Sequence, residues 1–354
     1  MKQQNHLIDL NDYSVQTWDK IVSLAQLIMK TPHVYKGACT GKIMATLFYE
    51  PSTRTQMSFQ SAMLRLGGGI IGFDNPKTSS ISKGENLMDT IKTISGYSDV
   101  IVMRHFLEGA AKAAALTADC PIINAGDGGH LHPTQTLTDL LTLAEEKGRA
   151  DNLNIGICGD LKNGRTVHSL VRALSNYKNN KFTFISTPEL SMPDYIKQEL
   201  DYRENSSLEA ALPELDVLYM TRIQKERFAS EQEYQQQKEI FTLDVQKLKS
   251  AKDDMIIMHP LPRVDEIAGE VDKDPRAKYF KQANYGMYVR MALILYMLNS
   301  ENGEIDMKPL FVGTSSGHKC NNEKCVVNHE ETLRRKHFVE TSAGWVCEYC
   351  EERV

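Results

Sequence analysis

Short apolar runs alternate with longer amphipathic stretches over the first 300 residues, and this alternation restricts the possible fold more than any other feature. The apolar runs predict strands at residues 42–49, 70–73, 100–103, 121–124, 154–158, 181–185, 216–220 and 255–258. The stretches between them have apolar residues at three- and four-residue steps and predict helices at 55–66, 85–95, 134–146, 165–177 and 194–199. Such alternation is typical of α/β folds with parallel sheets covered by helices on both faces.

Eight strands are many for one small sheet, so the pattern predicts two doubly wound parallel-sheet domains joined by the helix at 134–146. We expect the first domain to comprise residues 1–133 and a returning helix at 284–300, and the second to comprise residues 134–283. Residues 301–317, which are rich in turn formers and charges, predict a linker. Residues 318–354 remain for a small third domain.

Charge and hydropathy exclude several classes of protein. The 41 Lys and Arg against 46 Asp and Glu give a net charge of −5, which is unusual for a protein that binds nucleic acid or membrane surfaces in general. The longest apolar run, 291–298, is too short to span a bilayer. The N-terminal residues lack the apolar core of a secretory signal. We therefore expect a cytoplasmic protein.

The seven cysteines fall into two groups. Cys39, Cys120 and Cys158 lie in apolar surroundings and are expected to be buried. The other four form the pattern C-x4-C, 21 residues, C-x2-C, which predicts one tetrahedral zinc ion held by Cys320, Cys325, Cys347 and Cys350. Four thiolates leave no open position, so the zinc should be structural. A redox C-x-x-C and disulfides are the alternatives, but the first ignores one pair and a reducing compartment disfavours the second.

A candidate anion site follows the first predicted strand. The run Ser52-Thr53-Arg54-Thr55 opens a predicted helix, where Ser52 can act as the cap. Hydroxyl groups, a guanidinium and free backbone N–H groups at a helix start suit phosphate.

Arginines recur at the same end of the later strands. Arg104, Arg165, Arg222 and Arg263 each follow a predicted strand, as Arg54 does. Because ligands of open α/β sheets bind at the carboxyl ends of the strands, five such arginines predict a site for substrates with several anionic groups. The sequence from Gly159 to Thr166 is close to the phosphate-loop pattern of nucleotide-binding proteins, G-x-x-x-x-G-K-[ST]. It has Arg165 in place of the required lysine, so we do not expect a nucleotide there.

In these motifs the first 300 residues resemble aspartate carbamoyltransferase. The matching segments are FYEPSTRTQMSF, KTSSISKGE, MRHFLEGAA, HPTQTLTDLL, GDLKNGRTVHSL, YMTRIQKER and HPLPRVDEI, in the order expected for that family. The resemblance implies transfer of a carbamoyl group from carbamoyl phosphate to L-aspartate, the committed step of pyrimidine synthesis.

The resemblance also implies roles for individual residues. Ser52, Thr53, Arg54 and Thr55 would hold the phosphate, while Arg104 and His132 would join Thr55 on the carbonyl oxygen. Gln135, Leu261 and Pro262 would contact the carbamoyl group, with a cis bond between Leu261 and Pro262. Arg165, Arg222 and Gln224 would bind aspartate. Ser79 and Lys83 would enter the site from a neighbouring subunit, so that the minimal unit is a homotrimer with shared active sites.

The zinc segment is similar to part of the separate regulatory chain of some bacterial enzymes. The nucleotide-binding half of that chain has no counterpart here, which puts control by nucleotides in doubt. We expect one structural zinc per chain, no cofactor in catalysis, and a higher assembly only if the zinc segment joins trimers.

Two alternatives stay open. An ornithine carbamoyltransferase shares the fold, but its last motif typically has Cys where this chain has Pro260, and Arg165 and Arg222 favour a dicarboxylate substrate. A zinc-ribbon module that binds nucleic acid or protein is the more remote alternative, and it rests on the basic run 334–337.

Overall fold

The computed structural model describes residues 5–222, 241–299, 307–315, 317–333, 337–342 and 344–354. The chain forms two compact units, which are Met1–Thr134 with Met287–Val354 (unit 1) and Gln135–Gly286 (unit 2). The helices α5 (Pro133–Glu146) and α10 (Tyr279–Asn299) each run from one unit into the other.

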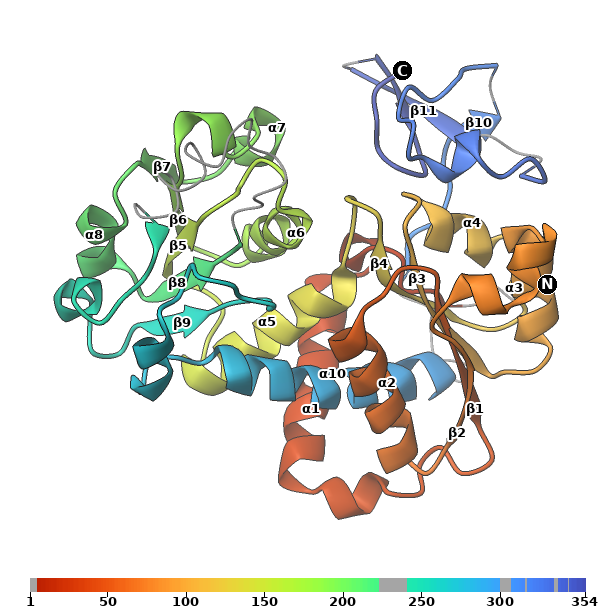
Figure 1. Cartoon of the computed structure of the whole chain (residues 1–354), viewed down its shortest axis with the longest axis horizontal. Helices are drawn as coiled ribbons and strands as arrows, with labels where there is room; N and C mark the ends of the chain where they lie inside the picture. The colour runs from red at the N-terminus through yellow and green to blue at the C-terminus, as the bar shows by residue number, and fades with distance from the viewer. Residues whose placement is uncertain (1–4, 223–240, 300–306, 316, 334–336, 343) are drawn as a thin grey trace. The chain divides into compact units, whose positions relative to one another are not determined.

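Unit 1 is built on a parallel sheet with the strand order β2-β1-β3-β4. These strands are Gly69–Phe73, Ile43–Phe48, Val100–His105 and Ile122–Asp127. The helices α3 (Leu87–Ser95) and α4 (Ala110–Ala115) cover one face of the sheet, and α1 (Val15–Lys30) and α2 (Thr53–Arg65) lie on the other (Figure 1). Because these four strands are parallel, the loops that follow them lie at one edge of the sheet, and these loops contain the polar motifs of the sequence.

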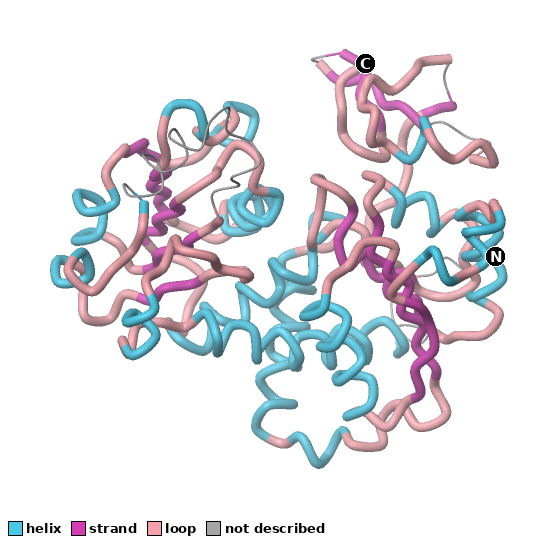
Figure 2. The backbone as a smooth tube through the Cα atoms, viewed as in Figure 1, coloured by secondary structure: helices cyan, strands magenta, loops and turns pink. Residues whose placement is uncertain are grey.

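Unit 2 contains a second parallel sheet, with the strand order β7-β6-β5-β8-β9. These strands are Tyr202–Asn205, Lys181–Ile185, Asn154–Cys158, Val217–Met220 and Ile256–Met258. Its helices include α6 (Arg165–Leu174), α7 (Asp194–Lys197) and α8 (Leu208–Ala211), and Figure 2 shows the strands of each unit enclosed by helices and loops.

The predicted fold class is confirmed, and all eight predicted strands are present within a few residues of their expected ends. The strand β7 was not predicted, because its residues, Tyr-Arg-Glu-Asn, are mostly exposed and carry no apolar run. The helix α1 was not predicted either, although Trp18, Ile21 and Ala25 form a buried helical stripe there. Two predicted helices are shorter than expected, since α6 ends at Leu174 and α7 ends at Lys197.

The C-terminal segment, residues 314–354, forms a small antiparallel sheet of β10 (Thr314–Ser315), β11 (His337–Thr341) and β12 (Gly344–Cys347). The strand β10 lies within the range that was predicted as a linker. The segment packs on α4 of unit 1, and its four cysteines share a buried cluster with the alanines of that helix. Among the described helices, none is long and apolar enough to cross a membrane.

Gly109, just before α4, packs closely against Tyr349 of the C-terminal segment. It has a φ of 80°, and a Cβ there would lie 2.6 Å from both Cβ and the carbonyl oxygen of Tyr349. Such a separation is shorter than any normal contact, so only glycine allows the two backbones to pack this closely.

We predict that Gly109→Ala destabilises the chain by ~1–3 kcal/mol through overpacking and strain, and loosens the C-terminal segment. Thermal unfolding and limited proteolysis of the segment would measure this. Gly317→Ala is the matched control, because nothing lies within 4 Å of its added Cβ. Equal protease resistance of the two variants would contradict the close packing.

Candidate functional site

The first candidate anion site lies where β1 leads into α2. Ser52 occupies the N-cap position, but its side chain makes no capping hydrogen bond with a described residue, so the prediction that its hydroxyl caps the helix is wrong. The first turn of a helix has no intrahelical acceptors for its N–H groups. Thr55 is buried and Arg54 is exposed in this turn. An uncapped helix start beside a guanidinium is a suitable place for an anion.

Arg104 and His132 are brought together around one glycine. Arg104, in β3, is 8% exposed; its Nη2 lies 3.0 Å from Glu50 Oε2, and its Nη1 donates to the Ala125 carbonyl at 3.2 Å. A Cβ on Gly126, whose φ is 123°, would lie 2.6 Å from Arg104 Nη1 and 3.6 Å from His132 Cδ2. The two predicted residues therefore flank the same backbone position, which must be glycine.

Asp127 organises the loop that carries His132. Its carboxylate is 1% exposed and accepts hydrogen bonds from the N–H groups of Leu131 (3.0 Å) and Gly109 (2.8 Å). It also lies 3.2 Å from Nδ1 of His130. Burial disfavours a charged His130 ring, but the carboxylates of Asp127 and Glu351 raise its pKa to about 10. Neither Asp127 nor His130 was predicted from the sequence, although the run Asp-Gly-Gly-His combines turn formers with charge.

Ser79 lies between two consecutive 3-10 turns of unit 1, Pro76–Thr78 and Ser80–Lys83, and Lys83 ends the second turn. The Ser79 hydroxyl donates to Pro76 O at 2.8 Å and accepts from Ile81 N at 3.3 Å, so its hydrogen bonds stay within its own turn. Lys83 is exposed, and its ammonium makes no ion pair or hydrogen bond with another described residue of this chain.

In unit 2, the buried Asp139 orients Gln135. Its carboxylate accepts from Gln135 Nε2 at 2.8 Å, from Gln282 Nε2 at 2.7 Å and from the Tyr219 hydroxyl at 3.0 Å. Because the amide nitrogen of Gln135 donates to a carboxylate, its amide oxygen can accept a hydrogen bond from a ligand.

The loop from Gly159 to Gly164 leads into α6, with Arg165 at the first helical position. The N–H groups of Leu161 and Lys162 both donate to Leu190 O at 3.1 Å, and Asn163 N donates to Asp160 Oδ1 at 3.1 Å. These N–H groups already have protein acceptors, so they do not form a phosphate cradle. Arg165 makes no side-chain ion pair or hydrogen bond with the described part of the chain.

The two remaining predicted arginines, Arg222 and Arg263, lie in different environments. Arg222 follows β8 and is half-buried, whereas Gln224 and the basic residues 334–336 lie outside the described residues. Arg263 forms a two-pronged ion pair with Asp272, with Nη2 2.6 Å from Oδ2. Arg263 therefore has a carboxylate partner within the chain, as Arg104 does.

The loop after β9 is fixed by a buried pair. His259 Nε2 lies 2.6 Å from Glu266 Oε1, and His259 Nδ1 accepts from Leu261 N at 2.7 Å. The Leu261–Pro262 peptide bond is cis, and Leu261 has a φ of 52°. Burial alone would raise the pKa of Glu266, but its hydrogen bonds and the charge of His259 lower it below the ordinary value.

The four C-terminal cysteines, Cys320, Cys325, Cys347 and Cys350, form a group suited to a metal ion. All four are buried, and their sulfur atoms lie within 4.8 Å of one another. The Cys320–Cys350 and Cys325–Cys347 sulfurs are 3.5 and 3.8 Å apart, too far for disulfides. In a tetrahedral site with Zn–S bonds of about 2.3 Å, the sulfurs lie about 3.8 Å apart, so this four-cysteine group fits zinc.

Two family models match the chain. One describes the aspartate/ornithine carbamoyltransferase carbamoyl-P binding domain and matches residues 5–145, and the other describes the Asp/Orn binding domain and matches residues 151–297. The C-terminal segment lies beyond both.

Curated relatives and solved structures agree with the family models. The aspartate carbamoyltransferase catalytic subunit of Clostridium perfringens is 58% identical over 84% of this chain and 99% of its own length, and that of Clostridium botulinum is 56% identical over the same shares. The catalytic subunit of M. jannaschii aspartate transcarbamoylase has a TM-score of 0.81 at 47% identity, over 84% of this chain and 99% of its own. The Trypanosoma cruzi enzyme in complex with N-(phosphonacetyl)-L-aspartic acid has a TM-score of 0.78 at 39% identity, over 83% and 95%.

The lowered pKa of Glu266 gives a prediction for stability. Its folded pKa lies below its unfolded value, so the ionised carboxylate stabilises the fold above the ordinary glutamate pKa, and this contribution is lost as the pH falls through the folded value. We expect Glu266→Gln to lower the free energy of unfolding by ~1–3 kcal/mol at pH 7, with a smaller difference from the wild type in acid.

Denaturant unfolding of the two proteins at several pH values measures this difference. Glu270→Gln is the matched control, because Glu270 is exposed on the same stretch of chain. A difference between Glu266→Gln and wild type that stays constant down to acid pH would refute the lowered pKa.

Proposed function

Since the chain belongs to the aspartate/ornithine carbamoyltransferase family, we propose that unit 1 binds carbamoyl phosphate and that unit 2 binds the amino-acid substrate. The chain is an aspartate carbamoyltransferase, a transferase of pyrimidine biosynthesis. It moves the carbamoyl group of carbamoyl phosphate to the amine of L-aspartate, giving N-carbamoyl-L-aspartate and phosphate. The observation that carries the residue assignments is the pairing of Arg104 with His132 around Gly126, close in sequence to the family motifs.

The phosphate of carbamoyl phosphate binds at the start of α2. The backbone N–H groups of the first turn, the Ser52 and Thr53 hydroxyls and the Arg54 guanidinium supply donors and positive charge to a dianion. The missing side-chain cap supports this assignment, because the N–H groups that Ser52 does not satisfy need another acceptor.

Arg104, His132 and Thr55 act on the carbamoyl carbonyl. The neutral amine of aspartate attacks the carbonyl carbon, and negative charge develops on its oxygen in the tetrahedral intermediate. Fixed donors aimed at that oxygen stabilise the transition state, and the orientation of Arg104 by Glu50 and Ala125 keeps them fixed. When the C–O bond to phosphate breaks, the departing phosphate takes the proton from the amine, so no side-chain base is required.

Gln135, Leu261 and Pro262 bind the carbamoyl amide group. The amide oxygen of Gln135 accepts from the carbamoyl NH2, since Asp139 holds its nitrogen. The carbonyl groups of Leu261 and Pro262 are further acceptors, on a loop fixed by His259 and Glu266.

Arg165, Arg222 and Gln224 bind aspartate. Arg165 opens α6 with no protein partner for its side chain among the described residues, and a planar guanidinium binds a carboxylate in a bidentate manner. Two cationic residues suit a dicarboxylate, whereas ornithine carries a cationic side chain that they would repel. The family models cover both substrates, and the relatives named above favour aspartate.

Ser79 and Lys83 serve the active site of a neighbouring subunit in a homotrimer. Their exposed turn and the absence of any intrachain partner for the Lys83 ammonium within the described chain support this role. The four-cysteine group holds one structural zinc ion per chain, with Cys320, Cys325, Cys347 and Cys350 as ligands. By its cysteine pattern the segment is similar to the zinc-binding part of a regulatory chain, which joins catalytic trimers to regulatory chains in some bacterial enzymes. We place the enzyme in the cytoplasm, with no nucleic-acid or membrane partner.

The first test is enzymatic. We expect the purified chain to carbamoylate L-aspartate and not L-ornithine, and Arg54→Ala to lower kcat by on the order of 10³ or more, because several kcal/mol of transition-state stabilisation are lost. Arg149→Ala, a change to an exposed arginine elsewhere, is the control. Activity of Arg54→Ala within about tenfold of wild type would place the phosphate elsewhere.

The shared site can be tested by mixing inactive variants. Lys83→Ala and Arg54→Ala chains, each inactive alone, should regain about a quarter of wild-type activity when mixed equally and reassembled, since one site in four then combines two intact halves. Native mass spectrometry verifies the exchange of subunits. If hybrid trimers form without activity, Lys83 acts within its own chain.

The metal assignment predicts that Cys347→Ser lowers the zinc content from about one ion per chain to nearly none and unfolds the C-terminal segment, because structural zinc supplies much of the folding energy of such small units. Elemental analysis and proteolysis of the segment measure the two effects. Cys120→Ser, a buried cysteine outside the group, should keep its zinc. Full zinc retention in Cys347→Ser would show that the ligand set is different.

A further inference from the structure

The C-terminal segment contacts the loop Gly126–His132 through Glu108. The Glu108 carboxylate accepts from Gly129 N at 3.1 Å through Oε1 and from Asn322 Nδ2 at 2.6 Å through Oε2. Gly129 lies three residues before His132, and Asn322 lies between Cys320 and Cys325. One side chain therefore joins the loop of the proposed active site to the first pair of cysteines.

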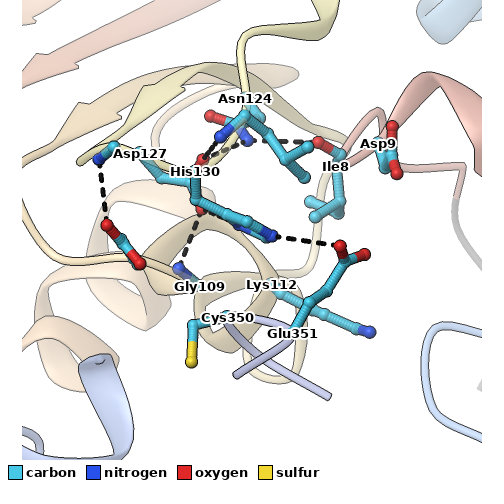
Figure 3. A network of polar contacts seen from close by, with 12 residues as sticks. Ile8, Asp9, Gly109, Lys112, Asn124, Asp127, His130, Cys350 and Glu351 are labelled. Atoms are coloured by element: carbon cyan, nitrogen blue, oxygen red, sulfur yellow. Dashed lines mark hydrogen bonds and ion pairs between the residues drawn. The ribbon is translucent and has the colours of Figure 1, made fainter. Parts of the chain in front are cut away.

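His130 makes a second, independent connection. Its Nδ1 lies 3.2 Å from Asp127 Oδ2, and its Nε2 lies 3.8 Å from Glu351 Oε2 (Figure 3). The His130 side chain is 12% exposed, and Nε2 has no hydrogen bond among the described residues, so Glu351 is the ionic partner of that nitrogen. Glu351 directly follows Cys350, so this bridge begins at the second pair of cysteines.

Both connections converge on the segment of chain that positions His132. Asp127, which holds His130, also accepts from Leu131 N at 3.0 Å, next to His132. The same carboxylate accepts from Gly109 N at the start of α4, on which the C-terminal segment packs. A shift of the C-terminal segment would therefore displace the loop Gly126–His132, because the side chains of Glu108 and His130 connect the two.

We propose that Glu108, His130 and Glu351 are positioning residues, through which the C-terminal segment holds the loop Gly126–His132 in the conformation needed for carbamoyl transfer. This inference rests on the proposed role of His132 at the carbamoyl carbonyl. Packing on the alanines of α4 already anchors the segment, so Glu351 is not needed to attach it. Small errors in the placement of a catalytic group are costly, since a displacement of about 1 Å can lower a rate by about 10²-fold.

The main experiment compares Glu351→Ala with Glu352→Ala, its exposed neighbour. We expect Glu351→Ala to lower kcat/KM for carbamoyl phosphate about tenfold, with both a lower kcat and a higher KM, and to weaken binding of N-(phosphonacetyl)-L-aspartate. Glu352→Ala should match wild type, and all variants should keep their zinc. Glu351→Gln, which keeps the length of the side chain and an acceptor oxygen, should recover part of the loss.

Coupling between the two bridging residues is the second readout. His130→Ala and the double variant with Glu351→Ala should each lose about tenfold, because one connection is broken in all three proteins, whereas independent effects would multiply to about a hundredfold. Hydrogen exchange at the Gly129 and Leu131 amides should accelerate in Glu351→Ala and not in Glu352→Ala. A merely structural role would lower the active fraction without raising KM or changing exchange in this loop.

His132→Ala separates this inference from the proposed site. If His132→Ala is nearly inactive while Glu351→Ala behaves as Glu352→Ala does, the positioning role is overturned and the site stands. If His132→Ala keeps its activity, the site assignment and this inference both fall.

Discussion

Buried carboxylates hold the loops after the strands and the helix α5 in place in the two units. Asp127, Asp139, Asp160 and Glu266 are each at most 4% exposed. An ionised carboxylate in such a place is strongly unfavourable unless its oxygens receive several hydrogen bonds. Each therefore gathers hydrogen-bond donors from nearby segments of the chain, and the loop has little freedom left. The fixed loops keep the catalytic side chains in position, and carbamoyl transfer requires reacting groups to be held in a defined geometry.

The same constraint decides which arginines remain for substrates. Arg104 and Arg263 both follow strands, and by sequence they look equivalent. Arg104 forms an ion pair with Glu50 and lies close to Gly126, so its guanidinium faces the loop of His132. Arg263 is neutralised by Asp272 and serves to fix its own loop. Both arginines have a carboxylate partner, so what distinguishes them is the part of the chain that each guanidinium faces.

The C-terminal segment depends on unit 1 as well as on its cysteines. Residues 314–354 are too few to bury a core of their own, and the sulfurs of the four-cysteine group supply the missing cohesion when they hold a metal. Alanines on α4 give the segment a flat surface, and Gly109 lets its backbone approach closely. If the C-terminal segment unfolds, its contacts with Glu108 and His130 are lost, and these residues adjoin the loop that carries His132.

The α/β class, eight of the strands, the four-cysteine group and the family motifs could be predicted from the sequence, because each depends on local periodicity or on fixed spacing. The folded structure was needed to show that Ser52 does not cap α2 and that Arg263 is paired. It alone brought Glu351 to His130, a residue far away in the chain, through the packing of the C-terminal segment on α4. Hydrogen bonds and ion pairs between distant residues depend on angles and distances that no local pattern encodes, so the positions of these side chains could not be predicted from their neighbours in the sequence.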